Sequence, residues 1–331
     1  MRSVLFAFLI FTFSSNAQLN IVGPIEYSGY EESVRTVHFS EDDKTVLGDW
    51  DDVIEWDIAS QKLLDKTEIP GYTINKSSYD GNSFWVNGNS NYNTEAKDIT
   101  DMHNNFNMLD SSVMKPTKVK RPYGLSAIIK GTKDVIVAAS TEKYTYQVVR
   151  LNTETFEETT IYFDENKHGT AVPTAIKVSD DGRYLGVSFA GEHAGVRIYD
   201  LESGTQLKYR ESDADANDFA FSSDGNYVFV GDGASLVQIN IKYWRDVRIW
   251  DVSGTITSLD VNSDGTYAVF SFQRKGAVLL NVQSGAIEAN LGNGTYWDVT
   301  FSNNDELIGL GVSKRLKNEG IASVHIYQIL K

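Results

Sequence analysis

The sequence contains no cysteine and only five prolines in 331 residues. The absence of cysteine excludes disulfides, a thiol nucleophile, thiolate metal ligands and a lipidated N-terminal cysteine, so stability must come from packing. Beyond residue 17, no apolar run approaches the ~20 residues of a membrane-spanning helix. Basic residues are few: 30 Lys and Arg stand against 45 Asp and Glu, a formal net charge of −15. This balance argues against nucleic acid and anionic lipid as partners.

The first seventeen residues have the pattern of a secretory signal peptide. Arg2 supplies a positive charge, residues 4–13 form an apolar run of ten, and small residues precede a cleavage site after Ala17. The alternative is an uncleaved membrane anchor, but ten apolar residues are too few to span a bilayer. We therefore expect cleavage before Gln18, a single mature domain at 18–331, and a secreted or periplasmic monomer without membrane insertion.

A four-strand pattern recurs along the chain and is clearest in residues 174–209. Its first turn, Ser179-Asp180-Asp181-Gly182, suits this position because Asp caps a turn and Gly accepts a positive φ. Turns of this kind end at Asp43, Gly81, Asp134, Gly182, Gly225, Gly265 and Asp305. Their spacing of 38–53 residues is typical of four-stranded propeller blades. The sequence therefore predicts an all-β, seven-bladed β-propeller.

The two ends of the chain are expected to complete each other. The last repeat lacks a fourth strand, whereas residues 19–27 form a β-type run without a repeat of its own. Pairing these two segments would close the ring and cover a sheet edge. The second repeat is irregular at residues 87–122, where we expect a long loop whose basic cluster is a solvated surface.

Two predicted third strands end in residues that point to a family. Trp56-Asp57 and Tyr199-Asp200 each close a strand before a turn, and Leu280-Asn281 is a weaker copy. Here the chain resembles WD-repeat β-propellers, although no repeat carries that family's Gly-His pair. The resemblance implies a rigid platform that binds protein or peptide. Trp250-Asp251 lies only a few residues before the next predicted first strand, so we expect it to end a fourth strand instead.

Loops entering the first strands and loops between second and third strands share one face of such a propeller. Aromatic and basic side chains, which dominate binding hot spots, gather in these loops. They are Trp50, Tyr72, Tyr123, Tyr144, His193, Arg274, Lys275, Tyr296, Lys314 and Arg315. The alternative for the three tyrosines at strand starts is simple packing. The sequence thus predicts a non-enzymatic binding or scaffold propeller that engages a protein or peptide through this face.

Catalytic and metal-binding motifs are weak. The five histidines show no close ligand spacing, and the calcium-loop-like run from Asp213 has Asp218 where a glycine is needed. We therefore expect no metal and no cofactor. The alternative function is a small-molecule hydrolase of the propeller lactonase type, to which the repeat pattern is similar. Its candidate funnel residues are His193 and Arg274.

Overall fold

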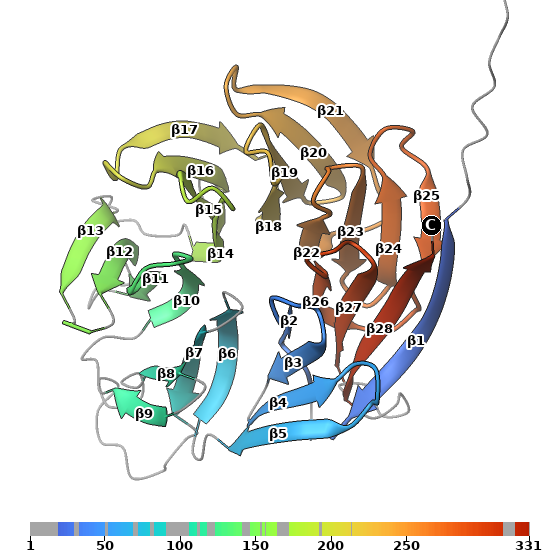
Figure 1. Cartoon of the computed structure of the whole chain (residues 1–331). Coiled ribbons are helices and arrows are strands. Elements are labelled where there is room, and N and C mark those ends of the chain that lie inside the picture. Colours follow the sequence, from blue (N-terminus) through green and yellow to red (C-terminus); the bar gives the residue numbers. More distant parts are fainter. Residues whose placement is uncertain are drawn as a thin grey trace, which may run out of the picture.

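The computed structural model shows an all-β propeller of four-stranded antiparallel sheets that stand around a common centre (Figure 1). This confirms the predicted fold class at the level of the propeller and its antiparallel blades. The structure describes residues 19–29, 33–49, 52–68, 72–79, 83–90, 106–110, 113–117, 123–140, 146–152, 154–155, 157–163, 172–191, 194–212, 214–313 and 322–330. Across these ranges, no helix is found that is long and apolar enough to cross a membrane.

The described strands pair into seven sheets, numbered here by the chain order of their first strands. Sheet 1 contains β2 (Thr36–Phe39), β3 (Thr45–Asp49), β4 (Asp52–Asp57) and β5 (Leu63–Glu68). Sheet 2 contains β6 (Tyr72–Tyr79), β7 (Ser83–Ser90), β8 (Phe106–Asp110) and β9 (Val113–Thr117). Sheet 3 contains β10 (Tyr123–Ile128), β11 (Asp134–Ser140), β12 (Tyr146–Asn152) and β13 (Glu158–Phe163). Sheet 4 contains β14 (Val172–Val178), β15 (Tyr184–Ala190), β16 (Gly195–Asp200) and β17 (Gln206–Glu211).

The remaining three sheets follow the same order. Sheet 5 contains β18 (Ala216–Phe221), β19 (Tyr227–Asp232), β20 (Ser235–Asn240) and β21 (Arg245–Asp251). Sheet 6 contains β22 (Ile256–Val261), β23 (Tyr267–Phe272), β24 (Gly276–Asn281) and β25 (Ile287–Asn290). Sheet 7 contains β26 (Tyr296–Phe301), β27 (Leu307–Val312), β28 (Ser323–Leu330) and β1 (Asn20–Ser28). Figure 1 shows the first strand of each repeat nearest the centre.

The hydrophobic core lies between neighbouring sheets. Phe229 of sheet 5 packs with Phe270 and Leu280 of sheet 6, and equivalent clusters join other neighbouring pairs. Second strands such as β23 are buried along nearly their whole length, because a sheet covers each of their faces. Outer strands such as β25 carry no fully buried residue. Each sheet therefore depends on its neighbours for most of its apolar burial.

The turn between first and second strands repeats with the same hydrogen bonds. In sheet 4, Ser179 Oγ accepts the N–H of Tyr184 at 2.9 Å and donates to Asp181 Oδ1 at 2.6 Å. Asp181 Oδ1 also accepts the N–H of Arg183 at 3.0 Å. Equivalent turns begin at Ser40, Ser222, Asn262 and Ser302. The turn chemistry predicted from the sequence is confirmed at these positions.

The last residue of this turn also joins neighbouring sheets. In sheets 1 and 4 to 7 it has a positive φ, and it is Gly182, Gly225 and Gly265 in sheets 4 to 6 but Asp43 and Asp305 in sheets 1 and 7. In sheet 3 the turn begins at Ile129, two residues before the predicted start at Gly131, and the positive φ falls on Gly131 instead of on the last residue. The Asp43 carboxylate accepts the N–H groups of Asn303 at 2.9 Å and Asn304 at 2.8 Å. Asp305 likewise accepts the N–H of Ser263 at 2.9 Å. At these two positions a carboxylate that bonds the adjacent turn replaces the glycine that the backbone favours.

The turn after the third strand is capped by an Asp or Asn side chain. Asp200 Oδ1 accepts the N–H of Ser203 at 2.9 Å, and Asp57 accepts that of Ser60 at 2.7 Å. Asn152, Asn240 and Asn281 do the same in their sheets. Trp250-Asp251 instead ends β21, the fourth strand of sheet 5, as expected.

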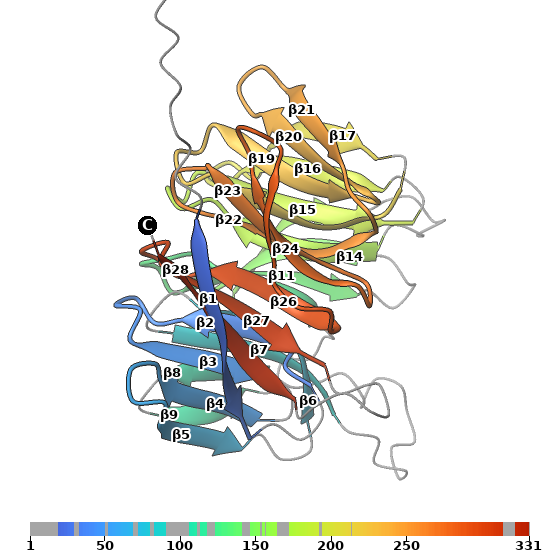
Figure 2. The ribbon, with the colours of Figure 1, turned by 90° about the vertical axis from the view of Figure 1, so that its right-hand side faces the viewer.

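The N-terminal strand pairs with the C-terminal strand, as the sequence predicts. β1 lies antiparallel to β28 with Asn20 opposite Leu330 and Ser28 opposite Ser323. Figure 2 views this edge of the molecule, with β1 in dark blue. In the irregular repeat, β8 and β9 occupy part of residues 87–122, whereas residues 91–105 lie outside the described ranges.

The turn-to-turn bonds of Asp43 make a stability prediction. We expect Asp43→Ala to lower the free energy of unfolding by about 1–2 kcal/mol, because two N–H groups lose a charged acceptor. Asp43→Gly should lose about 1 kcal/mol less, since glycine adopts positive φ without strain. Urea denaturation measures both. In Gly182→Ala the added Cβ meets nothing within 4 Å, so this control reports backbone strain alone. Wild-type stability in Asp43→Ala would contradict the proposed contribution of these bonds.

Candidate functional site

The innermost strands are sheet edges, so alternate N–H groups along them have no partner strand. In sheets 5, 6 and 7, side chains of one innermost strand accept these N–H groups from the next sheet. The bonds run from Leu259 to Asp218 Oδ2 (2.9 Å), from Val299 to Ser258 Oγ (3.2 Å) and from Val37 to Asp298 Oδ2 (2.9 Å). Each acceptor sits at the same register position of its strand. One row of side chains therefore links β18, β22, β26 and β2.

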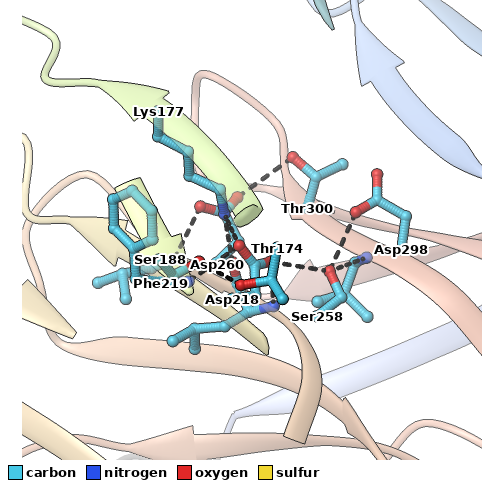
Figure 3. Close-up of polar contacts among 12 residues, drawn as sticks. Thr174, Lys177, Ser188, Asp218, Phe219, Ser258, Asp260, Asp298 and Thr300 are labelled. Carbon is cyan, nitrogen blue, oxygen red and sulfur yellow. Dashed lines mark hydrogen bonds and ion pairs between the residues drawn. The ribbon is translucent and has the colours of Figure 1, made fainter. Parts of the chain in front are cut away.

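Asp260 forms a second level of the same network, nearer the end of β22. Its Oδ2 accepts the N–H of Phe301 at 2.8 Å and the hydroxyl of Thr300 at 3.1 Å, both from β26. Its Oδ1 accepts the N–H of Val261 at 2.9 Å. Figure 3 shows Asp260 between β22 and the neighbouring strands, close to Thr300. Both oxygens of this carboxylate are therefore occupied by donors.

Among the described side chains, Lys177 is the cation of the network. It extends from β14 toward the acidic side chains (Figure 3), and its Nζ lies 3.0 Å from Asp218 Oδ1. The same nitrogen donates to the carbonyl of Leu259 at 2.9 Å. Asp218 is almost fully buried, with 3% of its side chain exposed, whereas Lys177 keeps 30%. The ion pair therefore crosses from sheet 4 to sheets 5 and 6 and still contacts solvent on the lysine side.

Within the described part of this network, the carboxyl groups of Asp218, Asp260 and Asp298 face the one ammonium group of Lys177. Burial lowers the pKa of Lys177, but the carboxylates of Asp218, Asp260 and Asp298 outweigh it and leave the pKa raised. Burial also raises the pKa of Asp260 to about 6, although Lys177 and the bonds from Phe301 and Val261 oppose that change. Asp260 is half-buried and retains some accessible surface. It is therefore placed to exchange a proton near pH 6.

A third level of bonds starts from residues at β-bulges. The register of β14 shifts around Thr174 and that of β18 around Asn217. Thr174 Oγ1 donates to the carbonyl of Ala216, and Asn217 Nδ2 donates to that of Ile256 at 2.9 Å. A bulge re-aims a side chain out of the regular alternation. Here it directs a donor to the next sheet.

The network can hold strands together and can exchange a proton at Asp260. Its carboxylate oxygens are the acceptors that edge N–H groups require. Within the described ranges, no group of three or more His, Cys, Asp or Glu side chains is placed to hold a metal ion.

The residues predicted to form the binding face fall into three groups. Arg274 and Lys275 lie together in the turn between β23 and β24, where both are exposed. Lys275 Nζ donates to the carbonyl of Ser253 at 2.8 Å, and Arg274 has a positive φ of 61°. Tyr296 begins β26 with only 4% of its surface exposed. Its hydroxyl donates to the carbonyl of Leu291 at 3.2 Å, which matches the packing alternative.

The other predicted site residues are placed less fully. Tyr72 and Tyr123 begin β6 and β10, but their side chains are outside the described part of the structure. The residues wholly outside it are Trp50, Tyr144, His193, Lys314 and Arg315. Of the predicted face, the structure thus brings together the pair Arg274 and Lys275.

Sequence reasoning did not single out the charged residues of the innermost strands. Asp218 and Asp298 each stand four residues before the serine that opens the following turn. Lys177 and Asp260 each stand two residues before the equivalent position. A charged side chain within an apolar first strand, repeated at a fixed distance from a turn, is the signal that would have found them.

Asp260 gives the site a pH signature. Its folded-state pKa of about 6 lies above the 3.8 of an ordinary Asp. The fold therefore loses stability as pH rises through that window, by at most about 3 kcal/mol. Because asparagine does not titrate, we expect the stability of Asp260→Asn relative to wild type to rise from pH 4 to pH 7 in urea titrations. Asp42→Asn, an exposed turn variant, should leave the slope above pH 4 unchanged. A parallel pH dependence of Asp260→Asn and wild type would contradict this assignment.

Comparison of the chain with protein-family models gives no match, and comparison with curated proteins gives none either.

Proposed function

We propose that this chain is an exported, non-enzymatic propeller that binds a protein or peptide on its loop-lined face. The observation that carries the proposal is the use of the central carboxylates. Asp218, Asp260 and Asp298 each accept a backbone N–H from the next sheet, so their main work is to hold strands in place. We therefore assign binding to the loops, whose sequences can vary without disturbing the scaffold.

The turn at Arg274 and Lys275 supports a basic contact on that face. Both side chains are exposed, and within the described residues Arg274 makes no hydrogen bond or ion pair. An unengaged guanidinium offers a planar set of donors that matches a carboxylate. A peptide segment with an acidic side chain is the ligand that fits this turn best.

We further propose that the seven sheets are the blades of one closed ring of the WD-repeat type. The Asp and Asn caps after the third strands support the relationship to that family. Sheets 1 and 7 also touch directly: Val34 N donates to the carbonyl of Val312 at 3.0 Å, and Ser33 bridges to Ser313. The β1–β28 pair would complete the last blade.

Electron microscopy tests the ring. We expect class averages viewed along the central axis to show seven sectors without a gap, since each repeat contributes one sheet. Six sectors, or an open arc, would contradict the proposal.

The binding proposal predicts a loss of affinity on one face. We expect the double variant Arg274→Ala/Lys275→Ala to weaken binding to its native partner about tenfold, because two exposed cations are removed at one contact. Native pull-down identifies the partner, and titration calorimetry measures the affinity. Lys62→Ala is the matched control, since this exposed lysine lies in a turn between third and fourth strands. Equal binding by all three proteins would refute the assignment of the face.

The alternative is the small-molecule hydrolase. The observation that favours it is Asp260, whose pKa is raised to about 6 by burial and which is therefore suited to acid–base chemistry. The same protein preparations, incubated with lactones and simple esters, separate the two functions. Turnover by wild type that disappears in a folded Asp260→Asn variant would replace the binding proposal.

A further inference from the structure

β1 is held to the propeller by few side chains. Tyr27 is its only fully buried residue, and the remaining strand is largely exposed. The Tyr27 hydroxyl donates to the carbonyl of Ile58 at 3.0 Å, and its ring packs edge-on against Trp56 at 5.9 Å between centroids. Ile21 and the preceding Leu19 pack partly against the core cluster of sheets 6 and 7, and the rest of the attachment is the main-chain ladder with β28.

A half-buried histidine lies in that ladder. His325 of β28 stands directly opposite Glu26 of β1, with 3.6 Å between His325 Nε2 and Glu26 Oε1. The His325 side chain is 15% exposed and that of Glu26 is 64% exposed. His325 Nδ1 is buried and has no hydrogen-bond partner among the described residues. One ring nitrogen therefore faces an acid while the other has nothing to bond.

The groups around His325 offer few acceptors for a second N–H of a protonated ring. The ring of Tyr296 meets it at 6.1 Å between centroids. Both Tyr296 and Tyr327 give their hydroxyl hydrogens to the carbonyl of Leu291, at 3.2 and 2.8 Å. From β27, Leu310 stands opposite His325 and is apolar. Glu26 is thus the charged group that faces His325 from β1, and the tyrosines are the titratable groups that face it from within sheet 7.

We propose that β1 is an acid-sensitive strap: protonation of His325 weakens the β1–β28 ladder and releases β1 while the rest of the propeller stays folded. An imidazolium donates from both nitrogens, so a buried Nδ1–H without an acceptor carries a desolvation penalty. Detaching β1 removes one of the strands that cover the His325 ring and would let water reach the buried Nδ1, and weakly held outer segments open first. Releasing the strand also exposes the edge of β28.

The direction of the pH effect follows from two opposing effects on the pKa of His325. Burial lowers its pKa from the usual 6.5, and Glu26 opposes this only in part. The folded state therefore binds the proton less readily than the unfolded chain does. The stability that His325 contributes is present above pH 6.5 and is lost as pH falls below that value.

Hydrogen exchange with mass spectrometry tests the strap on the mature chain. After correction for the intrinsic pH dependence of exchange, we expect β1 amides to exchange several-fold faster at pH 5.5 than at pH 7.5. Amides of β23, buried in sheet 6, should not change. His325→Gln should abolish the acid effect on β1, whereas Glu26→Gln should enlarge it, since it removes the group that stabilises the imidazolium. His38 lies in β2 of sheet 1, outside the β1–β28 ladder, and the matched control His38→Gln should leave the acid effect on β1 unchanged.

A disulfide clamp separates strap release from general loosening. The chain has no cysteine, so Val22→Cys/Gln328→Cys introduces one defined pair at directly opposite positions on β1 and β28. The oxidised clamp should suppress the acid-induced exchange of β1, and reduction should restore it. The proposal is overturned if His325→Gln keeps the wild-type pH response, or if β1 and β23 loosen together.

Discussion

The structure depends on how the inner edges of its sheets are satisfied. An edge strand presents N–H groups that need acceptors, and at the centre of a propeller no further strand can supply them. Asp218, Ser258 and Asp298 provide the acceptors from the neighbouring sheet. A charged acceptor makes a stronger hydrogen bond than a neutral one, and each bond also fixes the register between two sheets.

The use of carboxylates as acceptors at the inner edges has an electrostatic consequence. Three carboxylates near one another disfavour full ionisation, and Lys177 is the cation that the described structure places among them. The raised pKa of Asp260 shows that burial outweighs that compensation. A buried ion pair of this kind is weak evidence for net stability, whereas the bonds accepted by Asp218, Asp260 and Asp298 each join two sheets at a defined register.

Among the described side chains, the hydrogen bonds between sheets are concentrated in one part of the molecule. In sheets 3 and 4, the positions equivalent to Asp218 are Leu125 and Ala175. Between these sheets, Ile136, Val187 and Phe189 form an apolar cluster. Part of the propeller is thus held chiefly by hydrophobic contact, and the part from sheet 5 through sheet 7 to sheet 1 also by directed bonds. The turn-to-turn bonds of Asp43 and Asp305 fall in that second part.

Hydrogen bonds within a turn could be predicted from the sequence, whereas hydrogen bonds between distant sheets could not. The turns at Ser179 and Asp200 depend on residues within five positions, so their hydrogen bonds were predictable from pattern alone. The bond from the N–H of Val37 to Asp298 joins residues 261 positions apart, and no local pattern predicts it. Tyr296 shows the converse, since a strand-start aromatic reads equally as a contact residue or a packed one until its burial is known.

The two edges and two faces of each sheet leave little surface free for a ligand. Faces are covered by neighbouring sheets, and the inner edges of sheets 6, 7 and 1 donate to the side chains of Asp218, Ser258 and Asp298. Several outer edges are interrupted: the pairing of β5, β17 and β21 skips Leu64, Leu207 and Val247. Such bulges impair the addition of another strand. With these edges and faces engaged, the loops at the ends of the strands are where the proposed binding of a partner is expected.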